Sequence, residues 1–377
     1  MSKGHRDAIV IGAGPGGSAA AIALTRAGWS VTLADRGPHR RAKCCGHCVH
    51  PRAFAALERL GCADRIRLVC AGDTRRGEAW VVDADGARRI ADEPFATCGA
   101  VIDRATLDAA LVDAARDAGV TVRHGAAARL APDRTAVELD GARHEAELIV
   151  GADGLGSGVA RAAGLAAGGA GRKFGFALDV VPTPDHAWRH ERIVMLVARG
   201  GYLGVVGTGD GLHLAACLQS TGRLPTRPID AIQWFAERTP ALRDALGAAW
   251  QRRVDGVVAA GPMPWRTIAR TTSRVALVGD AAGYVEPFTG EGIAWAIESG
   301  AALGEAIGAG GAWDAAARLR YERAWNELAR ASHRRCRVVA GIVERPRLVA
   351  TLGATLGAIG RVAPRVRRNV VRGLVSR

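Results

Sequence analysis

The sequence has no uninterrupted apolar run of about 20 residues, the length that a membrane-spanning helix requires. No secretory signal is expected, because the first apolar segment, residues 8–11, leads directly into a glycine-rich turn. The eight cysteines are therefore expected to be free thiols in a reducing cytoplasm. Basic arms, zinc fingers and aromatic RNA-binding motifs are also missing, so nucleic acid is not an expected partner.

Aromatic residues make up only 5% of the chain, whereas glycine is abundant at 49 residues. Many glycines suit tight turns and a close approach of the backbone to a ligand. The formal net charge of +14 has two explanations: solvated helix faces with arginine-rich codon usage, or an anionic substrate, cofactor or membrane surface. The length of 377 residues allows one large domain or two interleaved ones with a sizeable core.

The start of the chain predicts a strand over 7–11, a turn over 12–17, a helix over 18–27 and a strand over 29–35. Such a βαβ unit implies a parallel sheet. Its turn fits the pattern G-x-G-x-x-G, and an acidic residue ends the next strand, which together form the dinucleotide-binding fingerprint. We expect the pyrophosphate at the start of the helix, where unpaired N–H groups favour negative charge. The candidate contacts are Gly12, Gly14, Pro15, Gly16, Gly17, Asp35 and Arg36.

The fingerprint leaves NAD and FAD open, but residues 274–292 separate them. They read R-V-A-L-V-G-D-A-A-G-Y-V-E-P-F-T-G-E-G and resemble the second FAD motif of the p-hydroxybenzoate hydroxylase superfamily. The resemblance implies that the Gly279-Asp280 pair lies at the ribityl chain of FAD. It also implies that the following residues line the isoalloxazine ring, with a helix N-terminus at the pyrimidine side: Pro287, Gly290, Gly292 and Ile293.

Two further segments are similar to the same superfamily. Residues 150–161 read V-G-A-D-G-L-G-S-G-V-A-R, and the resemblance places Asp153 near FAD. Arg104 stands where the family carries an arginine that contacts the FAD phosphates or ribose, although an arginine at a helix start can equally be solvated.

The loop at residues 43–48, K-C-C-G-H-C, resembles the Lys-x-Cys-Gly loop of the geranylgeranyl-reductase-like branch, which makes Lys43 and Cys44 candidate cofactor contacts. Residues 200–206 stand at the place of that branch's Tyr-x-Trp-x-Phe-Pro motif but lack its Trp, Phe and Pro. Three roles stay open for Cys44, Cys45 and Cys48: shaping the flavin pocket, a redox or covalent flavin role, or zinc binding with a histidine. No metal is expected, because the spacing fits no standard zinc knuckle.

The resemblance implies an α/β fold: a Rossmann-like FAD-binding domain, an inserted antiparallel-sheet substrate domain and C-terminal helices. Strand-like runs are expected at 176–181, 192–198, 202–206 and 213–218, and helices at 229–238 and 241–251. The expected boundaries are 1–75, 99–173 and 269–311 for the FAD-binding domain, 76–98 and 174–268 for the substrate domain, and 312–377 for the helical region.

The expected function is a FAD-dependent oxidoreductase that takes hydride from NAD(P)H and hydroxylates a hydrophobic aromatic or polyketide-like substrate. The alternatives are a reductase of isoprenoid double bonds and a flavin-binding redox sensor without turnover. The candidate catalytic residues are His47, Cys48, Tyr202 and Glu286. Residues 360–377 alternate Val or Leu with Arg, so they are expected either to pack on the core or to touch an anionic membrane surface.

Overall fold

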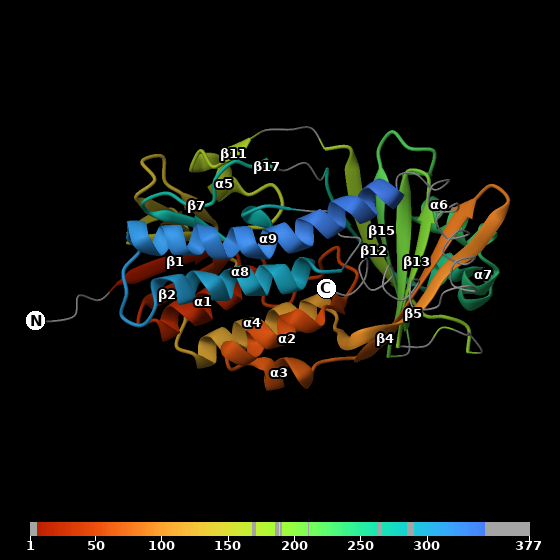
Figure 1. The fold of residues 1–377 in the computed structure, drawn as a ribbon, viewed down its shortest axis with the longest axis horizontal. Helices are drawn as coiled ribbons and strands as arrows, with labels where there is room; N and C mark the ends of the chain where they lie inside the picture. Colours follow the sequence, from red (N-terminus) through yellow and green to blue (C-terminus); the bar gives the residue numbers. More distant parts are fainter. Residues whose placement is uncertain are drawn as a thin grey trace, which may run out of the picture.

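A computed structural model of the chain describes residues 6–167, 171–184, 188, 191–209, 211–262, 266–284 and 290–343, with side chains as far as residue 330. Two sheets lie side by side along the long axis of the molecule, and helices cover them (Figure 1). The fold is the mixed α/β arrangement expected from the sequence. Among the described residues, none of the helices is long and apolar enough to cross a membrane.

The first sheet has five strands in the order β18-β10-β1-β2-β6, and every neighbouring pair is parallel. This confirms the parallel sheet that the βαβ pattern predicted. The strands are β1 (Asp7–Ile11), β2 (Ser30–Asp35), β6 (Thr121–His124), β10 (Leu148–Gly151) and β18 (Val275–Leu277).

Helix α1 (Pro15–Arg26) begins earlier than residue 18, where the sequence placed its start. Proline suits the first position of a helix because its missing N–H would have no partner there. Helix α4 (Arg104–Asp117) has Asp103 as its N-cap, and the Asp103 side chain accepts a hydrogen bond of 2.8 Å from the N–H of Thr106.

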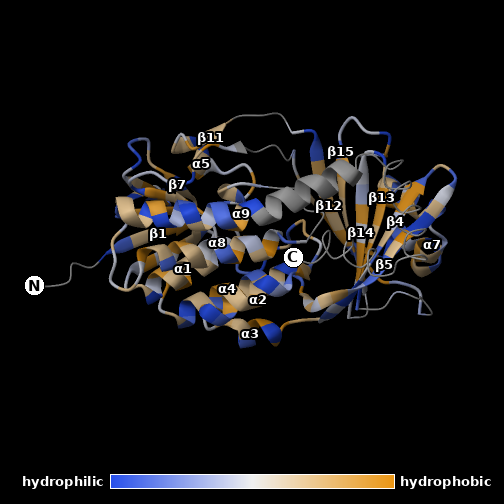
Figure 2. Ribbon diagram, in the orientation of Figure 1, coloured by the Kyte–Doolittle hydropathy of each residue, from blue (hydrophilic) through white to orange (hydrophobic). Residues whose placement is uncertain are grey.

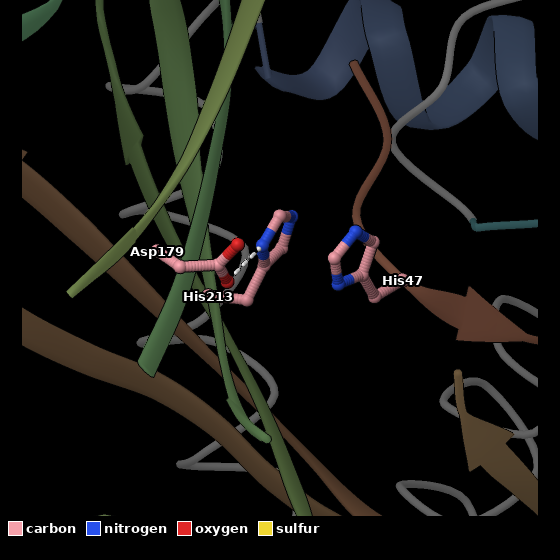
Figure 3. Close-up of side chains that lie close together, drawn as sticks. All are labelled: His47, Asp179 and His213. Atoms are coloured by element: carbon pink, nitrogen blue, oxygen red, sulfur yellow. Dashed lines mark hydrogen bonds and ion pairs between the residues drawn. The ribbon is translucent and has the colours of Figure 1, made fainter. Parts of the chain in front are cut away.

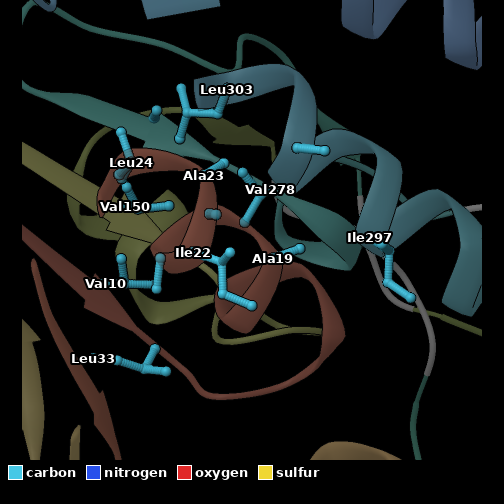
Figure 4. Packing of buried hydrophobic residues seen from close by; sticks show 14 of the residues in the cluster. Val10, Ala19, Ile22, Ala23, Leu24, Leu33, Val150, Val278, Ile297 and Leu303 are labelled. Atoms are coloured by element: carbon cyan, nitrogen blue, oxygen red, sulfur yellow. The ribbon is translucent and has the colours of Figure 1, made fainter. Parts of the chain in front are cut away.

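Helices α1 and α8 (Gly292–Ile307) pack against each other through two glycines of α8. A β-carbon added at Gly300 would lie 2.4 Å from the carbonyl oxygen of Gly16. A β-carbon added at Gly304 would lie 2.5 Å from the β-carbon of Ala23. Figure 4 shows the neighbouring core, in which Ile22 and Leu303 lie among buried strand residues. The close approach of the two backbones sets the distance between the nucleotide-binding turn and the start of α8.

Replacing Gly304 with valine is therefore expected to lower the free energy of unfolding by about 3 kcal/mol, because the packed core has no room for the side chain. Urea unfolding followed by circular dichroism measures this change. Gly310 serves as the control, since no atom lies within 4 Å of an added β-carbon there. Its positive φ of 67° makes alanine the fitting substitution, with a loss of about 1 kcal/mol. Equal losses in both variants would contradict the packing argument.

The second sheet has eight strands in the order β16-β12-β15-β14-β13-β4-β5-β3, antiparallel except for the parallel pair of β13 and β4. They are β3 (Cys48–Val49), β4 (Gly72–Asp83), β5 (Gly86–Val101), β12 (Lys173–Val180), β13 (Arg192–Ala198), β14 (Gly201–Thr208), β15 (Gly211–Gln219) and β16 (Val254–Ala260). Strands β4 and β5 form a long hairpin that runs on along the neighbouring strands. The domain boundaries expected from the sequence stay a prediction.

Helices α6 (Pro228–Arg238) and α7 (Pro240–Leu246) cover the outer face of the second sheet, where they form a separate core with Leu212, Leu214 and Leu218. The prediction of a helix over 241–251 was wrong beyond 246. Gly247 takes a left-handed φ of 67° and ends α7 there, and a short 3₁₀ turn, η1 (Trp250–Arg253), follows.

Smaller elements complete the described chain. They are α2 (Pro51–Arg59), α3 (Ala63–Arg67), β7 (Ala128–Leu130), β8 (Ala136–Leu139), β9 (Ala142–Glu145), α5 (Gly158–Ala162), β11 (Ala166–Ala167), β17 (Arg266–Thr267), η2 (Gly279–Ala281) and α9 (Ala315–Val343). Helix α9 runs along α8 toward the second sheet (Figure 1). Figure 2 shows hydrophobic residues along the strands of the second sheet and hydrophilic ones on the outward side of α3.

Candidate active site

The glycine-rich turn between β1 and α1 is held by close backbone packing. Gly12 has a φ of 106°, and an added β-carbon would lie 2.4 Å from the carbonyl oxygen of Ala152. A β-carbon at Gly17 would lie 1.8 Å from the carbonyl oxygen of Gly12. These two glycines therefore shape the turn, because any side chain would collide with the backbone.

Gly14 differs from them, because among the described residues only the Lys43 ammonium nitrogen lies within 4 Å of an added β-carbon, at 3.4 Å. Gly14 is also the N-cap of α1, and no side chain caps this helix start. Free N–H groups and a nearby ammonium group are the partners that a diphosphate requires. A side chain at Gly14 would fill this space, so the residues present fit FAD.

Asp35 lies at the end of β2, where the sequence placed it, and it also holds the turn. Its carboxylate accepts hydrogen bonds of 2.8 Å from the N–H of Ala13 and 2.7 Å from the N–H of Gly37. Each oxygen retains a free lone pair for a ribose hydroxyl, a role that stays a prediction. Arg36 beside it is exposed.

Three charged side chains from separate segments meet beside this turn. Lys43 Nζ lies 2.7 Å from Asp108 Oδ2, and Arg104 Nε lies 3.2 Å from Asp108 Oδ1. Burial alone raises the pKa of Asp108, but Arg104 and Lys43 outweigh it and bring the pKa below 3.8. Burial alone lowers the pKa of Arg104, but Asp108 and the Cys45 side chain, to which Arg104 donates a hydrogen bond, raise it overall. The sequence analysis missed Asp108, although its place four residues after Arg104 on a helix was a usable signal.

Asp280 is half-buried and lies within electrostatic reach of the same two cations. Its burial raises its pKa from 3.8 to about 6, while Arg104 and Lys43 act in the opposite direction. The preceding residue, Gly279, donates a hydrogen bond of 2.8 Å to the Ser299 hydroxyl and packs against Gly16 of the turn. The first and second FAD-like motifs and Arg104 therefore meet in one place.

The cysteine loop meets the start of α8. A β-carbon added at Gly290 would lie 3.7 Å from the β-carbon of Cys48. No atom of the described residues lies within 4 Å of a β-carbon added at Gly292, and Ile293 behind it is buried. Glu286 and Pro287 lie outside the described residues.

Two cysteines of this loop, Cys44 and Cys48, are protonated thiols. Burial, and secondarily Cys45, raises the pKa of both Cys44 and Cys48 to about 12. A thiol with this pKa is a weak nucleophile at neutral pH. The geometry therefore favours a loop that shapes the flavin pocket.

Asp153 has a local structural role that the sequence analysis missed. Its carboxylate accepts hydrogen bonds from the Ser157 hydroxyl and from the N–H of Gly158, at 2.7 Å, at the start of α5. Its backbone also lies against Gly12, since an added β-carbon there would be 3.0 Å from the Asp153 α-carbon. Its predicted contact with FAD stays a prediction.

His47 lies in the cysteine loop and meets two polar residues of the second sheet that the sequence analysis did not single out, His213 and Asp179 (Figure 3). The imidazole rings of His47 and His213 stack with centroids 3.5 Å apart and planes 16° from parallel. A metal bound by both rings would have to lie in both ring planes, which stacked rings do not allow. In this arrangement the cluster therefore does not form a shared ion site.

Tyr202 lies on the same sheet face as His213 but not beside it. Tyr202 pairs with Cys217, whereas His213 pairs with Val206, so the two side chains are about 13 Å apart along the strands. Tyr202 packs with Val197, Cys217 and Met195 in a small cluster. The structure thus places His47 and Cys48 in the loop that meets the start of α8, and Tyr202 at the far end of the sheet face.

The parallel sheet, the glycine-rich turn and the half-buried Asp280 near two cations are the features of a FAD-binding oxidoreductase. The family model described as "FAD binding domain" matches residues 5–345, so the chain belongs to this family. FAD is its cofactor, and NAD(P)H is the reductant typical of the family.

Two curated relatives extend along most of the chain. The menaquinone reductase of Mycolicibacterium smegmatis is 30% identical over 95% of this chain and 88% of its own length. The 6-hydroxynicotinate 3-monooxygenase of Bordetella bronchiseptica is 29% identical over 85% of this chain and 88% of its own. Among solved structures, a variant of 2-methyl-3-hydroxypyridine-5-carboxylic acid oxygenase aligns with a TM-score of 0.75 at 23% identity. It covers 90% of this chain and 93% of its own, and supports the fold.

Proposed function

We propose that this chain is a NAD(P)H-driven monooxygenase that hydroxylates a flat, hydrophobic aromatic or polyketide-like ring. The carrying observation is the inner face of the second sheet, where three adjacent strands place Ala177, Ala215 and Gly204 side by side. This floor of small residues begins at His213, which contacts the cysteine loop. Two curated relatives are named as monooxygenases, 6-hydroxynicotinate 3-monooxygenase and kynurenine 3-monooxygenase.

The floor leaves room above it. Ala215, Gly204 and Met195 are partly exposed, whereas Leu214 and Val205 on the other face are buried. A flat ring has the shape that such a floor accommodates, with large contact area and little entropy lost on binding.

We assign the diphosphate of FAD to the start of α1 and to Lys43, and the ribityl chain to Asp280. Bound FAD supplies hydride acceptance from NAD(P)H and the reduction of oxygen. The protein holds the ring over the floor and excludes water from it. In the balanced reaction, substrate C–H, O₂, NAD(P)H and a proton give substrate C–OH, NAD(P)⁺ and water.

The test supplies ¹⁸O₂ to the FAD-loaded protein with NADPH or NADH and a panel of phenols, naphthols and alkylresorcinols. Incorporation of one ¹⁸O atom into the product, with one NAD(P)H oxidised for each, supports the proposal. Oxidation of NAD(P)H that yields only hydrogen peroxide with every ring would overturn it.

Replacing Gly204 with tryptophan is expected to abolish stimulation of NAD(P)H oxidation by the ring substrate, at least about 100-fold in kcat/KM, while FAD remains bound. The indole would cover the floor, since Met195 Sδ lies only 3.3 Å from an added β-carbon. Gly204→Ala is the matched control, with at most a several-fold loss. Unchanged ring-stimulated oxidation in the tryptophan variant would show that the floor does not hold the substrate.

A second candidate function is reduction of a carbon–carbon double bond in an isoprenoid or quinone. The observation favouring it is the 30% identity with a menaquinone reductase, together with the Lys43–Gly46 resemblance. The oxygen-label assay separates the two, because a reductase gives a product two hydrogens heavier with no label. Peripheral membrane contact by residues 360–377 and a cytoplasmic location stay predictions, and these residues lie outside the described part of the chain.

A further inference from the structure

The stacked histidines form a built polar cluster inside an otherwise apolar face. His47 and His213 are only 4% and 3% exposed. His47 comes from the cysteine loop, directly before β3, and His213 comes from β15, so the cluster links this loop to the second sheet (Figure 3). We call His47, His213 and Asp179 the histidine cluster.

His213 carries a proton on both ring nitrogens. Nδ1 lies 2.8 Å from the Asp179 carboxylate, and Nε2 lies 2.6 Å from the carbonyl oxygen of Cys45. A carbonyl and an ionised carboxylate only accept hydrogen bonds, and a neutral imidazole has a single N–H. The imidazolium form of His213 satisfies both contacts at once, and the Asp179 side chain beside it is 48% exposed.

His47 has the opposite protonation state. Burial, and secondarily the charge of His213, lowers the pKa of His47 to about 3. Its Nε2 lies 3.7 Å from Asp103 Oδ1, beyond hydrogen-bonding distance, and the nearby carboxylate favours the tautomer with the N–H on Nε2. The Nδ1 atom is then a hydrogen-bond acceptor, and it is buried without a partner among the described residues. An orphaned buried acceptor is destabilising unless a ligand donates to it.

His47 also has a strained backbone, with a φ of 57°, in the loop that meets the start of α8. Two contacts hold it: the stack on His213 and the hydrogen bond of 2.9 Å that its carbonyl accepts from the N–H of Ile102. Strain kept in place by surrounding contacts is typical of ligand-binding positions.

We propose that the histidine cluster binds a hydroxyl group of the ring substrate, which donates a hydrogen bond to His47 Nδ1, and that charged His213 is the positioning residue that holds His47 in place. This inference rests on the proposed function for its ring substrate. No proton is transferred in this contact. An accepted hydrogen bond places electron density on the ring, which favours attack by an electrophilic oxygen. The ligand class is therefore an aromatic ring with at least one free hydroxyl, such as a phenol or resorcinol.

The binding test uses 5-pentylresorcinol and its dimethyl ether, titrated against the FAD-loaded protein and followed by the flavin difference spectrum. The wild type is expected to bind the resorcinol at least about 10-fold more tightly than the dimethyl ether, since one hydrogen bond to a buried acceptor is worth about 1.4 kcal/mol. His47→Phe retains a stacking ring but has no acceptor, and is expected to lose this preference. His47→Asn tolerates the left-handed backbone and retains an acceptor, and is expected to keep part of it.

A wild type without preference, including one that binds neither probe, overturns the proposal, as does a His47→Phe variant that retains the preference while its FAD content stays normal. Should His47→Phe fail to fold, Asp179→Asn decides. A preference that persists without any ¹⁸O incorporation leaves the hydroxyl site standing and removes only the monooxygenase function.

The positioning role of His213 has a readout in the same binding assay. Its charged and titratable neighbours are Asp179, His47 and Cys45, with Asp103 and Arg104 behind His47. Asp179→Asn removes the carboxylate that holds His213 and is expected to reduce the preference for the resorcinol while FAD content stays normal. Asp255→Asn, an exposed acid directly across from Asp179 on β16, is the matched control and leaves the preference unchanged. An Asp179→Asn variant with the wild-type preference contradicts the positioning role.

Discussion

Replacing Gly14 with valine is expected to give a folded protein that binds FAD at least about 100-fold more weakly, a loss of about 3 kcal/mol of binding free energy. Gly14 has an ordinary φ of −80°, so valine introduces no backbone strain. The added side chain points into the space between the start of α1 and Lys43, which we assign to the FAD diphosphate. Flavin absorbance per polypeptide after reconstitution with FAD measures the loss.

Two control variants separate weaker FAD binding from a loss of folding. Gly14→Ala adds a single methyl group and is expected to weaken FAD binding by a smaller factor. Gly17→Val would place its β-carbon 1.8 Å from the carbonyl oxygen of Gly12 and is expected to unfold the turn itself. In circular dichroism melting of the flavin-free proteins, Gly14→Val should then have a melting temperature close to that of the wild type. A Gly14→Val protein that binds FAD with wild-type affinity would contradict the assignment of the diphosphate to this space.

The parallel sheet and the glycine-rich turn could be predicted from the sequence, because the signals that specify them lie within short segments of the chain. A glycine that must take positive φ, a helix that begins at a proline, and an acid at a strand end each act within a few residues, as at Gly12, Pro15 and Asp35. The parallel order of the strands follows from the handedness of βαβ connections. The meeting of Lys43, Arg104 and Asp280 could be inferred only through the family resemblance, because more than 60 residues separate each from the next.

The histidine cluster could not be predicted, because it depends on strand register. Asp179 and His213 face each other only in the observed pairing of β12 with β15, and shifting one strand by a single residue would separate them. No motif marks either residue. A weak signal was present in β15, where a histidine interrupts the apolar run Leu212–Leu214. Polar residues inside a buried strand are uncommon without a partner, but the sequence does not say which partner.

Asp280→Asn is expected to change two properties in opposite directions: it stabilises the flavin-free protein and weakens FAD binding. Burial raises the Asp280 pKa from 3.8 to about 6 in the folded chain. Folding therefore disfavours the charged form, and the destabilisation is absent below about pH 4 and complete above about pH 6, where it reaches about 3 kcal/mol. The flavin-free wild type should thus lose stability as the pH rises through this window, and the asparagine variant should not.

Urea unfolding of both flavin-free proteins between pH 4 and pH 8 measures the difference, which should grow from near zero to about 3 kcal/mol. FAD affinity should fall by about 10-fold or more, because an amide offers one acceptor oxygen to the ribityl hydroxyls where a carboxylate offers two. Exposed Asp255→Asn should change neither quantity. A variant that is less stable than the wild type at pH 8 would show that Asp280 has a folded-state partner without FAD. A variant that is more stable but has unchanged FAD affinity would show that Asp280 does not contact the cofactor. Only a gain in stability together with a loss of FAD affinity identifies Asp280 as a carboxylate that binds the cofactor at the expense of stability.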